Sequence, residues 1–334
     1  QALVDAARAD ETAAAVERLG LPVWLSGMAR GMLGPAHPLH RRHQRRKALK
    51  EADLVILAGV PSDFRLDYGR NVRRSACLIS ANRSRIDLRR NRRPTIGALC
   101  DAGAFIRTLA ETLDPAPERW ASWHQALQTR DAEREKEIDA TAARTGEHIN
   151  PVALCRTIDA ELPDKSVIVA DGGDFVGTAS YIVRPRKRLA WLDPGVFGTL
   201  GCGAGFALGA SLCHPDHQIW AIFGDGSVGY ALAEFDTFTR HQIPVLAVVG
   251  NDACWAQIAR EQVKMLGDDV GTVLARSDYH EVAAALGGHG VLLKDANQTA
   301  LRLQEAQHAV AEGAPALVNA WLDTTDFREG SLSM

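Results

Sequence analysis

The sequence predicts an α/β protein built from two doubly wound parallel-sheet domains. Short apolar runs rich in β-branched residues alternate with helical stretches, which is the pattern of a parallel sheet covered by helices on both faces. A charged segment with prolines at its start interrupts this alternation near the middle of the chain. The length of 334 residues is a comfortable size for two domains.

Composition places the chain among ordinary globular proteins. Apolar residues make up 46% and charged residues 24% of the sequence, as in typical domains. The net charge of −3 gives no global field that would attract nucleic acid. No apolar run reaches the roughly 18 residues of a membrane span. The six cysteines are scattered without a CxxC spacing, which predicts reduced thiols in a cytoplasmic protein, with neither a disulfide framework nor a zinc site.

The first predicted domain covers residues 1–113. The expected elements, in order, are a helix at 1–15, a strand at 21–27, a basic loop and helix at 37–52, strands at 53–59 and 75–82, and a helix at 101–113. A doubly wound half-sheet normally starts with a strand, whereas this chain starts with a helix. We therefore expect this domain to lack its first strand, and the chain to be the C-terminal part of a longer protein.

Residues 114–147 are punctuated by proline and then become charged and helical, which predicts a linker helix on the surface. A second domain is predicted for residues 148–334. It opens on a helix for which Asn150 is the expected N-cap and Pro151 lies in the first turn. The remaining expected elements are strands at 166–173, 218–226, 244–252 and 315–323, a glycine-rich stretch leading into a helix at 193–212, and a helix at 231–241.

Two polar side chains stand at the ends of two successive strands of this second domain. Asp225 lies in a Gly-Asp-Gly turn and Asn251 ends the next strand. Right-handed crossovers bring the carboxyl ends of such strands to one sheet edge, where ligands bind in open α/β sheets. A carboxylate oxygen and an amide oxygen suit Mg²⁺ or Ca²⁺ that keeps its other positions for water and phosphate. Gly-Asp-Gly alone is also common as a plain strand–helix turn.

The turn is also suited to a phosphate. Gly224 and Gly226 allow the backbone to turn sharply and to approach a ligand closely. The helix that follows directs its N-terminus at the same place and favours an anion there. Twenty-four residues, 227–250, separate Gly226 from Asn251.

This spacing resembles the fingerprint of thiamine-diphosphate (ThDP) enzymes, in which Gly-Asp-Gly is followed by Asn after a spacer of this length. The resemblance extends over essentially the whole chain. The stretch "VADGGDFVGTA" is similar to the diphosphate-contacting turn of acetolactate synthases, and "GTLGCGAGFALGA" to their cofactor-binding glycine segment. In the first domain, "GMARGMLGPAHPL" and "DLVILAGVPSDFRLDYGR" resemble their middle domain. Within this superfamily the chain is most similar to the 2-hydroxyacyl-CoA lyases.

The resemblance implies two doubly wound domains, a truncated middle domain and a ThDP diphosphate-binding domain. It also implies a set of site residues. Mg²⁺ would be bound by Asp225, by the side chain of Asn251 and by the backbone carbonyl of Ala253. The diphosphate would be contacted by Gly226 and Ser227 on one side and by Gly173, Asp174 and Phe175 on the other. The aminopyrimidine would be held by Gly198 and Leu200. For Leu200 and Phe175, ordinary core packing is the alternative.

The same resemblance places the glutamate that activates ThDP in an N-terminal pyrimidine-binding domain. We therefore expect the chain alone to be inactive, with no certain catalytic residue of its own. The active site would be completed by a preceding segment, usually from a partner subunit of a homodimer or homotetramer. Glu234, on the helix after Gly-Asp-Gly, is not expected to substitute for that glutamate.

The implied reaction is a ThDP- and Mg²⁺-dependent cleavage of a 2-hydroxyacyl-CoA to an aldehyde and formyl-CoA. Acetolactate synthesis, or another 2-oxoacid reaction, is the enzymatic alternative, and a non-catalytic ThDP-binding subunit is the third. Arg260 stands where acetolactate synthases carry a substrate-selecting Trp, which makes it a candidate catalytic residue for an acidic or CoA-bearing substrate, or a plain surface residue.

Two further features have open interpretations. The basic run Arg41, Arg42, Arg45, Arg46 and Lys47 could meet CoA phosphates or form a solvated helix face, and some family members bind FAD or ADP in this domain instead. The C-terminal residues 324–334 resemble a tail that covers the active site in 2-hydroxyacyl-CoA lyases, and a frayed end is the alternative.

Overall fold

The computed structural model describes residues 2–114 and 116–330, which fold into two compact units. The first unit runs to Glu137 and includes Lys187–Leu189, and the second comprises Ile138–Arg186 and the chain from Ala190 on. The chain passes from one unit to the other within α5 (Ala121–Ala142), inside the segment predicted as a linker helix. The predicted domain limits of 1–113, 114–147 and 148–334 stay a prediction.

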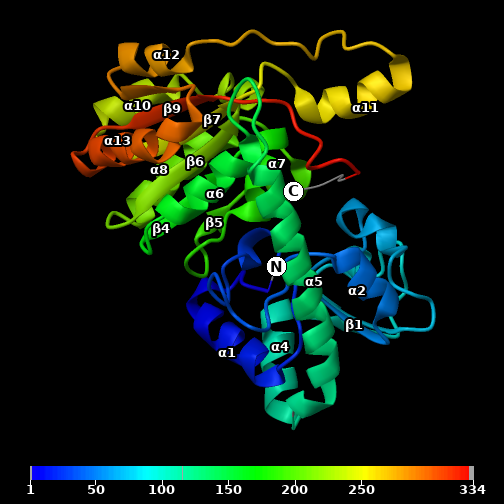
Figure 1. The fold of residues 1–334 in the computed structure, drawn as a ribbon. Coiled ribbons are helices and arrows are strands. Elements are labelled where there is room, and N and C mark those ends of the chain that lie inside the picture. Colours follow the sequence, from blue (N-terminus) through cyan, green and yellow to red (C-terminus); the bar gives the residue numbers. More distant parts are fainter. Residues whose placement is uncertain (1, 115, 331–334) are drawn as a thin grey trace. The chain divides into compact units, whose positions relative to one another are not determined.

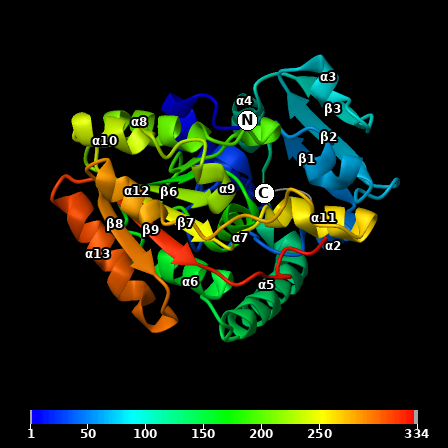
Figure 2. The ribbon, with the colours of Figure 1, turned by 90° about the horizontal axis from the view of Figure 1, so that it is seen from above.

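The first unit contains a small parallel sheet with the strand order β1-β2-β3 (Figure 2). Its strands are β1 (Leu54–Ala58), β2 (Cys77–Asn82) and β3 (Ile96–Leu99). Its helices are α1 (Ala9–Leu19), α2 (Arg45–Glu51), α3 (Arg85–Leu88) and α4 (Ala102–Thr112), followed by the first part of α5. Helices α1 and α4 pack on each other through one apolar cluster, and the buried side chains of β1 and β2 form a second.

The predicted strand at 21–27 is wrong. Residues 21–27 form only an isolated bridge, in which Val23 exchanges two backbone hydrogen bonds with the loop carrying Leu39 and Arg41. Short, irregular loop backbone offers no further partners for a ladder, so the apolar run stays extended without becoming a sheet strand. The strands expected at 53–59 and 75–82 and the helix at 101–113 are confirmed as β1, β2 and α4.

The second unit contains a six-stranded, all-parallel sheet with the order β5-β4-β6-β7-β9-β8. Its strands are β4 (Ser166–Ala170), β5 (Trp191–Leu192), β6 (Gln218–Gly224), β7 (Val245–Asn251), β8 (His289–Leu293) and β9 (Ala316–Trp321). Its helices are α6 (Pro151–Glu161), α7 (Asp174–Ile182), α8 (Cys202–Cys213), α9 (Asp225–Val228), α10 (Glu234–Arg240), α11 (Ala256–Leu266), α12 (Tyr279–Ala285) and α13 (Thr299–Ala311).

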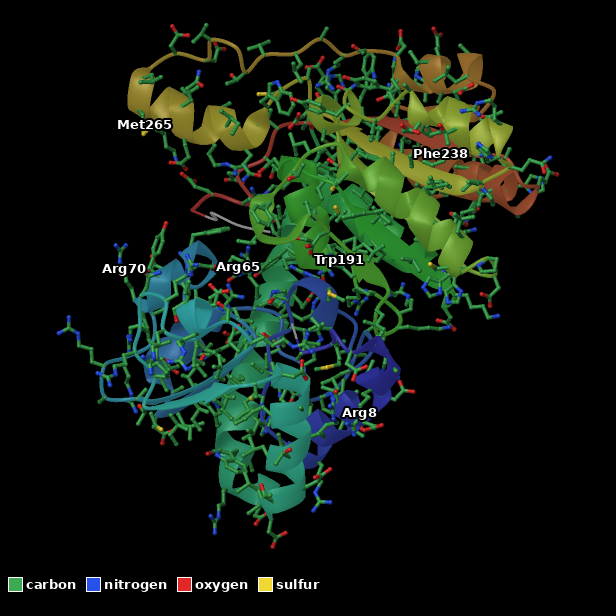
Figure 3. The ribbon with its side chains drawn as sticks, turned by 180° about the vertical axis from the view of Figure 1, so that it is seen from behind. Arg8, Arg65, Arg70, Trp191, Phe238 and Met265 are labelled. Atoms are coloured by element: carbon green, nitrogen blue, oxygen red, sulfur yellow. The ribbon has the colours of Figure 1, made fainter. Side chains whose placement is uncertain are left out.

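Alternate residues of the same strands enter two separate cores, because successive side chains of a strand point to opposite faces. In β6, Trp220 and Ile222 pack with α6, α7 and α13, whereas Ala221 and Phe223 pack with α8, α10 and α12. The α10 side chain Phe238 belongs to the second core (Figure 3). Helices therefore cover both faces, and the predicted fold class of doubly wound parallel sheets is confirmed.

Local sequence signals account for how several of these helices begin. Asn150 caps α6 by accepting from the N–H of Val152 at 2.9 Å, with Pro151 as the first helical residue, as predicted. In contrast, α11 begins without a side-chain cap and has no buried residue. It projects from the sheet (Figure 1), and Met265 near its end is 76% exposed (Figure 3). No described helix is long and apolar enough to cross a membrane.

Candidate active site

The strand order predicts a ligand-binding crevice at the carboxyl ends of β4 and β6. From β4 the chain continues to β5 on one side, whereas β6 lies on the other side and leads on to β7. This reversal is a topological switch point, where open α/β sheets bind their ligands. The N–H of Gly224 donates to the carbonyl of Gly172 at 3.2 Å, so the two turns that follow β4 and β6 are in direct contact.

Asp225 follows β6 directly and is 2% exposed. Its Oδ1 accepts from the N–H of Gly226 at 2.8 Å, and its Oδ2 accepts from the N–H of Cys254 at 3.2 Å. Burial raises the pKa of this carboxyl, and the backbone N–H groups of Gly226, Cys254 and Ala253 oppose the rise. Because none of these partners carries a charge, the buried carboxylate is well suited to accept a cation.

Asn251 ends β7 and lies next to Asp225. Strands β6 and β7 pair Gly224 with Gly250, so the two polar residues stand one step beyond a matched pair. The Oδ1 of Asn251 accepts from the N–H of Ala253 at 3.3 Å. Asp225 accepts from the adjacent N–H of Cys254. The structure therefore brings the two predicted ligands to one turn, as the strand pattern predicted, whereas their binding of a metal stays a prediction.

Ala253, the predicted third ligand, has a left-handed backbone with φ of 57°. Its carbonyl accepts from the N–H of Leu274 at 2.8 Å. A carbonyl oxygen has two lone pairs, so one remains for a cation. Among the described residues, no group of three His, Cys, Asp or Glu side chains is arranged to hold a metal. The geometry suits an ion bound by one carboxylate, one amide and one carbonyl, with water and phosphate in its other positions.

The acidic surroundings reinforce this preference for a cation. The pKa of Asp252 is raised to about 7, first by burial and then by the negative charges of Asp225 and Asp174. The charges of Asp225 and Asp174 thus both act on Asp252 in the turn at 252–254. A bound divalent ion would offset their mutual repulsion.

Two glycines shape the turns that follow β4 and β6. Gly173 has φ of 111°, a conformation that residues with a side chain rarely adopt. A Cβ at Gly226 would lie 2.5 Å from the ring of Trp255, so this glycine lets the indole rest on the turn. Ser227, which is 1% exposed, fixes the turn that contains Gly226. Its hydroxyl accepts from the N–H of Gly224 at 3.0 Å.

Helix α7 offers an anion-binding end to the same crevice. Gly173 is its N-cap, and no side chain in the described part of the chain caps its first N–H groups. Such an end attracts a phosphate through these N–H groups and the helix dipole. Phe175, predicted to contact the diphosphate, buries its ring in the core against Gly250. The contact left to Phe175 is its backbone N–H.

Asp174, the first residue of α7, joins two arginines. Its Oδ2 lies 2.6 Å from Nη2 of Arg260, and its Oδ1 lies 3.6 Å from Nη1 of Arg328. The three side chains are 5%, 11% and 4% exposed, respectively. Arg260 is therefore a mostly buried partner of Asp174, not an unpaired cation at an open mouth. Its role in catalysis, suggested from the sequence, stays a prediction.

The arginine at 328 was not anticipated, although it belongs to the tail at 324–334. Its guanidinium lies where a Cβ of Gly177 in α7 would be. Phe327 packs edge-to-face on Tyr181 with ring centroids 5.5 Å apart. The described part of the tail is therefore packed and not frayed, and residues 331–334 of the proposed lid lie outside the described residues.

Asp171 is a second site residue that the sequence reasoning missed. It is fully buried, and its two oxygens accept from the N–H groups of Gly201 and Gly203 at 3.0 and 2.7 Å. It thereby fixes the glycine segment that carries Gly198 and Leu200 to the end of β4. Leu200 packs on Gly172, where a Cβ would be 2.2 Å from its Cδ2. An acid directly after a buried strand, as at Asp225, was the signal available.

The basic run of the first unit is divided among separate contacts. Arg41 is buried, with Nη2 3.4 Å from Nδ1 of His124. Arg42 pairs with Glu135 at 3.6 Å, and Arg45 donates to the carbonyl of Arg65 at 2.7 Å. Three of the five basic side chains thus make contacts within the first unit, so the run does not form one solvated helix face. Binding of CoA, FAD or ADP there stays a prediction.

Comparison with known families identifies the chain. Residues 171–320 match the family model described as "Thiamine pyrophosphate enzyme, C-terminal TPP binding domain", and residues 2–109 match its central domain. The chain belongs to the thiamine pyrophosphate enzyme family. Thiamine pyrophosphate is another name for ThDP, so the crevice at the ends of β4, β6 and β7 lies within the matched TPP-binding domain.

Relatives within this family have known names. The chain is 49% identical to "2-hydroxyacyl-CoA lyase 2" of Bos taurus over 100% of this chain and 54% of that protein. It is 33% identical to a "Probable acetolactate synthase" of Mycobacterium bovis over 92% of this chain and 55% of that protein. The chain therefore spans about half the length of these relatives.

A solved structure of the family has a similar fold. It is the ThDP-dependent 4-hydroxybenzoylformate decarboxylase of Rhodococcus jostii RHA1, with a TM-score of 0.74 and 22% sequence identity, over 96% of this chain and 60% of that chain. At this identity the likeness supports the fold alone.

Proposed function

We propose that this chain is the cofactor-binding part of a ThDP- and Mg²⁺-dependent lyase that cleaves a 2-hydroxyacyl-CoA to an aldehyde and formyl-CoA. The convergence of Asp225 and Asn251 on one turn at the switch point is the observation that carries the cofactor site. The near-half identity to proteins named 2-hydroxyacyl-CoA lyase 2 supports the choice of reaction.

The residues of the crevice fit ThDP with a bound Mg²⁺. Asp225, Asn251 and the carbonyl of Ala253 would hold Mg²⁺, and the uncapped end of α7 with Gly226 and Ser227 would hold the diphosphate. Gly198 and Leu200 would hold the aminopyrimidine. When bound, ThDP would supply the nucleophilic carbon that the reaction needs, and the part of these residues would be to bind and orient the cofactor.

Asp174 and its arginines would tune the electrostatics of the diphosphate end. The carboxylate of Asp174 faces two guanidinium groups, so its negative charge is compensated at this end of α7. The helix dipole then favours an anion beside the helix N-terminus. We propose that Arg260 and Arg328 act there together, with a CoA-bearing or acidic substrate as the small-molecule partner.

Acetolactate synthase chemistry is the second candidate, because relatives at 33% identity carry that name. The two reactions are separated by assaying the natural full-length protein with ThDP and Mg²⁺. We expect formyl-CoA and aldehyde from a 2-hydroxyacyl-CoA, and no acetolactate from pyruvate. Acetolactate without formyl-CoA would reject the lyase. Neither product, with ThDP still bound, would favour a non-catalytic ThDP-binding subunit.

The chain of residues 1–334 should bind ThDP with Mg²⁺ and yet show no turnover. The family's activating glutamate is expected in a pyrimidine-binding domain, and the matched models are the central and C-terminal domains. Glu234 is exposed on α10, as expected of a residue that does not replace that glutamate. We also propose a homodimer or homotetramer in which a partner subunit completes the site. Formyl-CoA production by 1–334 alone would contradict this prediction.

A further inference from the structure

Asn319 is a polar residue in an otherwise apolar buried strand. It lies in β9, is fully buried, and pairs in register with Val249 of β7, two residues before Asn251. Its strand neighbours Leu317, Val318 and Ala320 are all core residues. A buried amide costs free energy unless its hydrogen bonds are made, so an apolar residue would serve the core better.

The amide of Asn319 is joined to that of Asn251 through one backbone carbonyl. The carbonyl of Ser277 accepts from Nδ2 of Asn251 at 3.2 Å and from Nδ2 of Asn319 at 2.9 Å. Nδ2 of Asn251 also donates to Oδ1 of Asn319 at 3.2 Å. A backbone carbonyl can only accept, so both amides must present their NH₂ groups to Ser277, and the orientation of each is fixed.

This arrangement decides which atom of Asn251 faces the crevice. Both hydrogens of its NH₂ group are used, one by Ser277 and one by Asn319. The oxygen is left on the opposite side, toward Ala253 and the turn that Asp225 also contacts. A rotated amide would present a donor to a cation, which a metal site cannot use.

The loop that supplies Ser277 is itself fixed to the sheet. The guanidinium of Arg276 donates to the carbonyl of Asn251 at 2.5 Å and to the carbonyl of Leu322 at 2.9 Å. It also lies over the ring of Trp321, 5.5 Å from the centroid. The ends of β7 and β9 and the loop at 276–277 are therefore held as one unit.

We propose that Asn319 is a positioning residue for the metal: together with the carbonyl of Ser277, it holds the amide oxygen of Asn251 toward the cation. This inference rests on the proposed function, because it needs a metal at Asp225 and Asn251. Partners that orient a ligand in this way typically contribute about 10- to 100-fold to metal affinity.

The test uses the purified 334-residue chain with ThDP and Mn²⁺, whose free and bound forms are distinguished by electron paramagnetic resonance. In Asn319→Leu the amide of Asn251 keeps only the carbonyl of Ser277 as an acceptor and is held less firmly, so we expect the Mn²⁺ concentration for half-saturation to rise at least about 10-fold. Asn82→Leu is the matched control. Asn82 is also a buried Asn at the end of a parallel strand, β2, but lies in the other unit, so this variant should leave half-saturation unchanged.

A second variant of Asn319 and a double variant with Asn251 test whether Asn319 acts on the metal through Asn251. Asn319→Thr retains a β-favouring residue in the strand but cannot reach the amide, so it should weaken Mn²⁺ binding as Asn319→Leu does. If Asn319 acts through Asn251, adding Asn319→Leu to Asn251→Ala should weaken Mn²⁺ binding no further. Half-saturation within twofold of wild type in folded Asn319→Leu or Asn319→Thr, or fully additive effects, would overturn the inference. If the wild-type chain binds no Mn²⁺ with ThDP, the proposed function fails first and this inference falls with it.

Discussion

An Asp225→Asn variant is expected to lose at least about 100-fold in metal affinity with ThDP present, because the amide removes the only full negative charge in the predicted ligand set. The variant should still fold. Burial raises the pKa of Asp225, so its ionised form opposes folding at neutral pH when no cation is bound, and a neutral side chain of the same shape avoids that cost. The Mn²⁺ titration measures the loss, and thermal unfolding without ligands measures the fold.

Asp216→Asn is the control for this experiment. Asp216 is 59% exposed in the same unit and pairs with Lys165 at 2.9 Å. Its replacement removes the same charge from the chain without touching the crevice. If Asp225→Asn bound Mn²⁺ with the affinity of the control, the residue would not be a metal ligand, and the proposed cofactor site would have to be abandoned.

Asp171→Ala is expected to lower the free energy of unfolding by about 2 kcal/mol. It leaves one buried N–H group without an acceptor, at about 1–3 kcal/mol, and removes a hydrogen bond from a second, partly buried N–H group. The two groups belong to Gly201, the N-cap of α8, and to Gly203 in the first turn of that helix. Urea unfolding measures the change. A loss below about 0.5 kcal/mol would show that the carboxylate does not hold this segment.

The isosteric Asp171→Asn removes the titrating group from the same position. Its NH₂ group cannot accept from an N–H group, so one of the two hydrogen bonds is lost, but that cost does not vary with pH. Burial raises the pKa of Asp171 more than the N–H groups of Gly201 and Gly203 lower it. A raised folded-state pKa means that ionisation opposes folding, so the carboxyl favours the folded state most at pH values below its unfolded pKa of about 3.9. That contribution is lost as the pH rises through the folded pKa. The stability of wild type relative to Asp171→Asn should therefore decline with rising pH, and a constant difference would contradict the assignment.

The sequence predicted the part of the site that depends on strand order. Apolar runs identified β6 and β7, and parallel pairing then required Asp225 and Asn251 to meet, as they do. Patterns of this kind act over neighbouring residues and the period of a strand. The failed strand at 21–27 had the same apolar signal, but a strand also needs a partner of matching length, which a single sequence does not reveal.

The missed residues share a different property, since each acts across a long separation in sequence. Asp171 holds Gly203, and Arg328 reaches Asp174 in α7. The hydrogen bond from Asn251 to Asn319 joins residues 68 positions apart. No local periodicity marks such contacts. The one available signal was a polar residue inside or just after an apolar run, and two of the three missed residues, Asp171 and Asn319, carry it.

Gly177 of α7 affects both the stability of this helix and the packing of Arg328 against it. Glycine weakens a helix by roughly 0.5–1 kcal/mol relative to alanine, so Gly177→Ala should make the helix more stable. The added methyl group would occupy the space of the guanidinium, and the C-terminal segment would detach and become open to proteases. Faster trimming of the variant at its C-terminus, alongside an unchanged or higher melting temperature, is the expected result, and equal trimming rates would contradict it. Gly177 therefore makes α7 less stable but allows the C-terminal segment to stay attached to this helix.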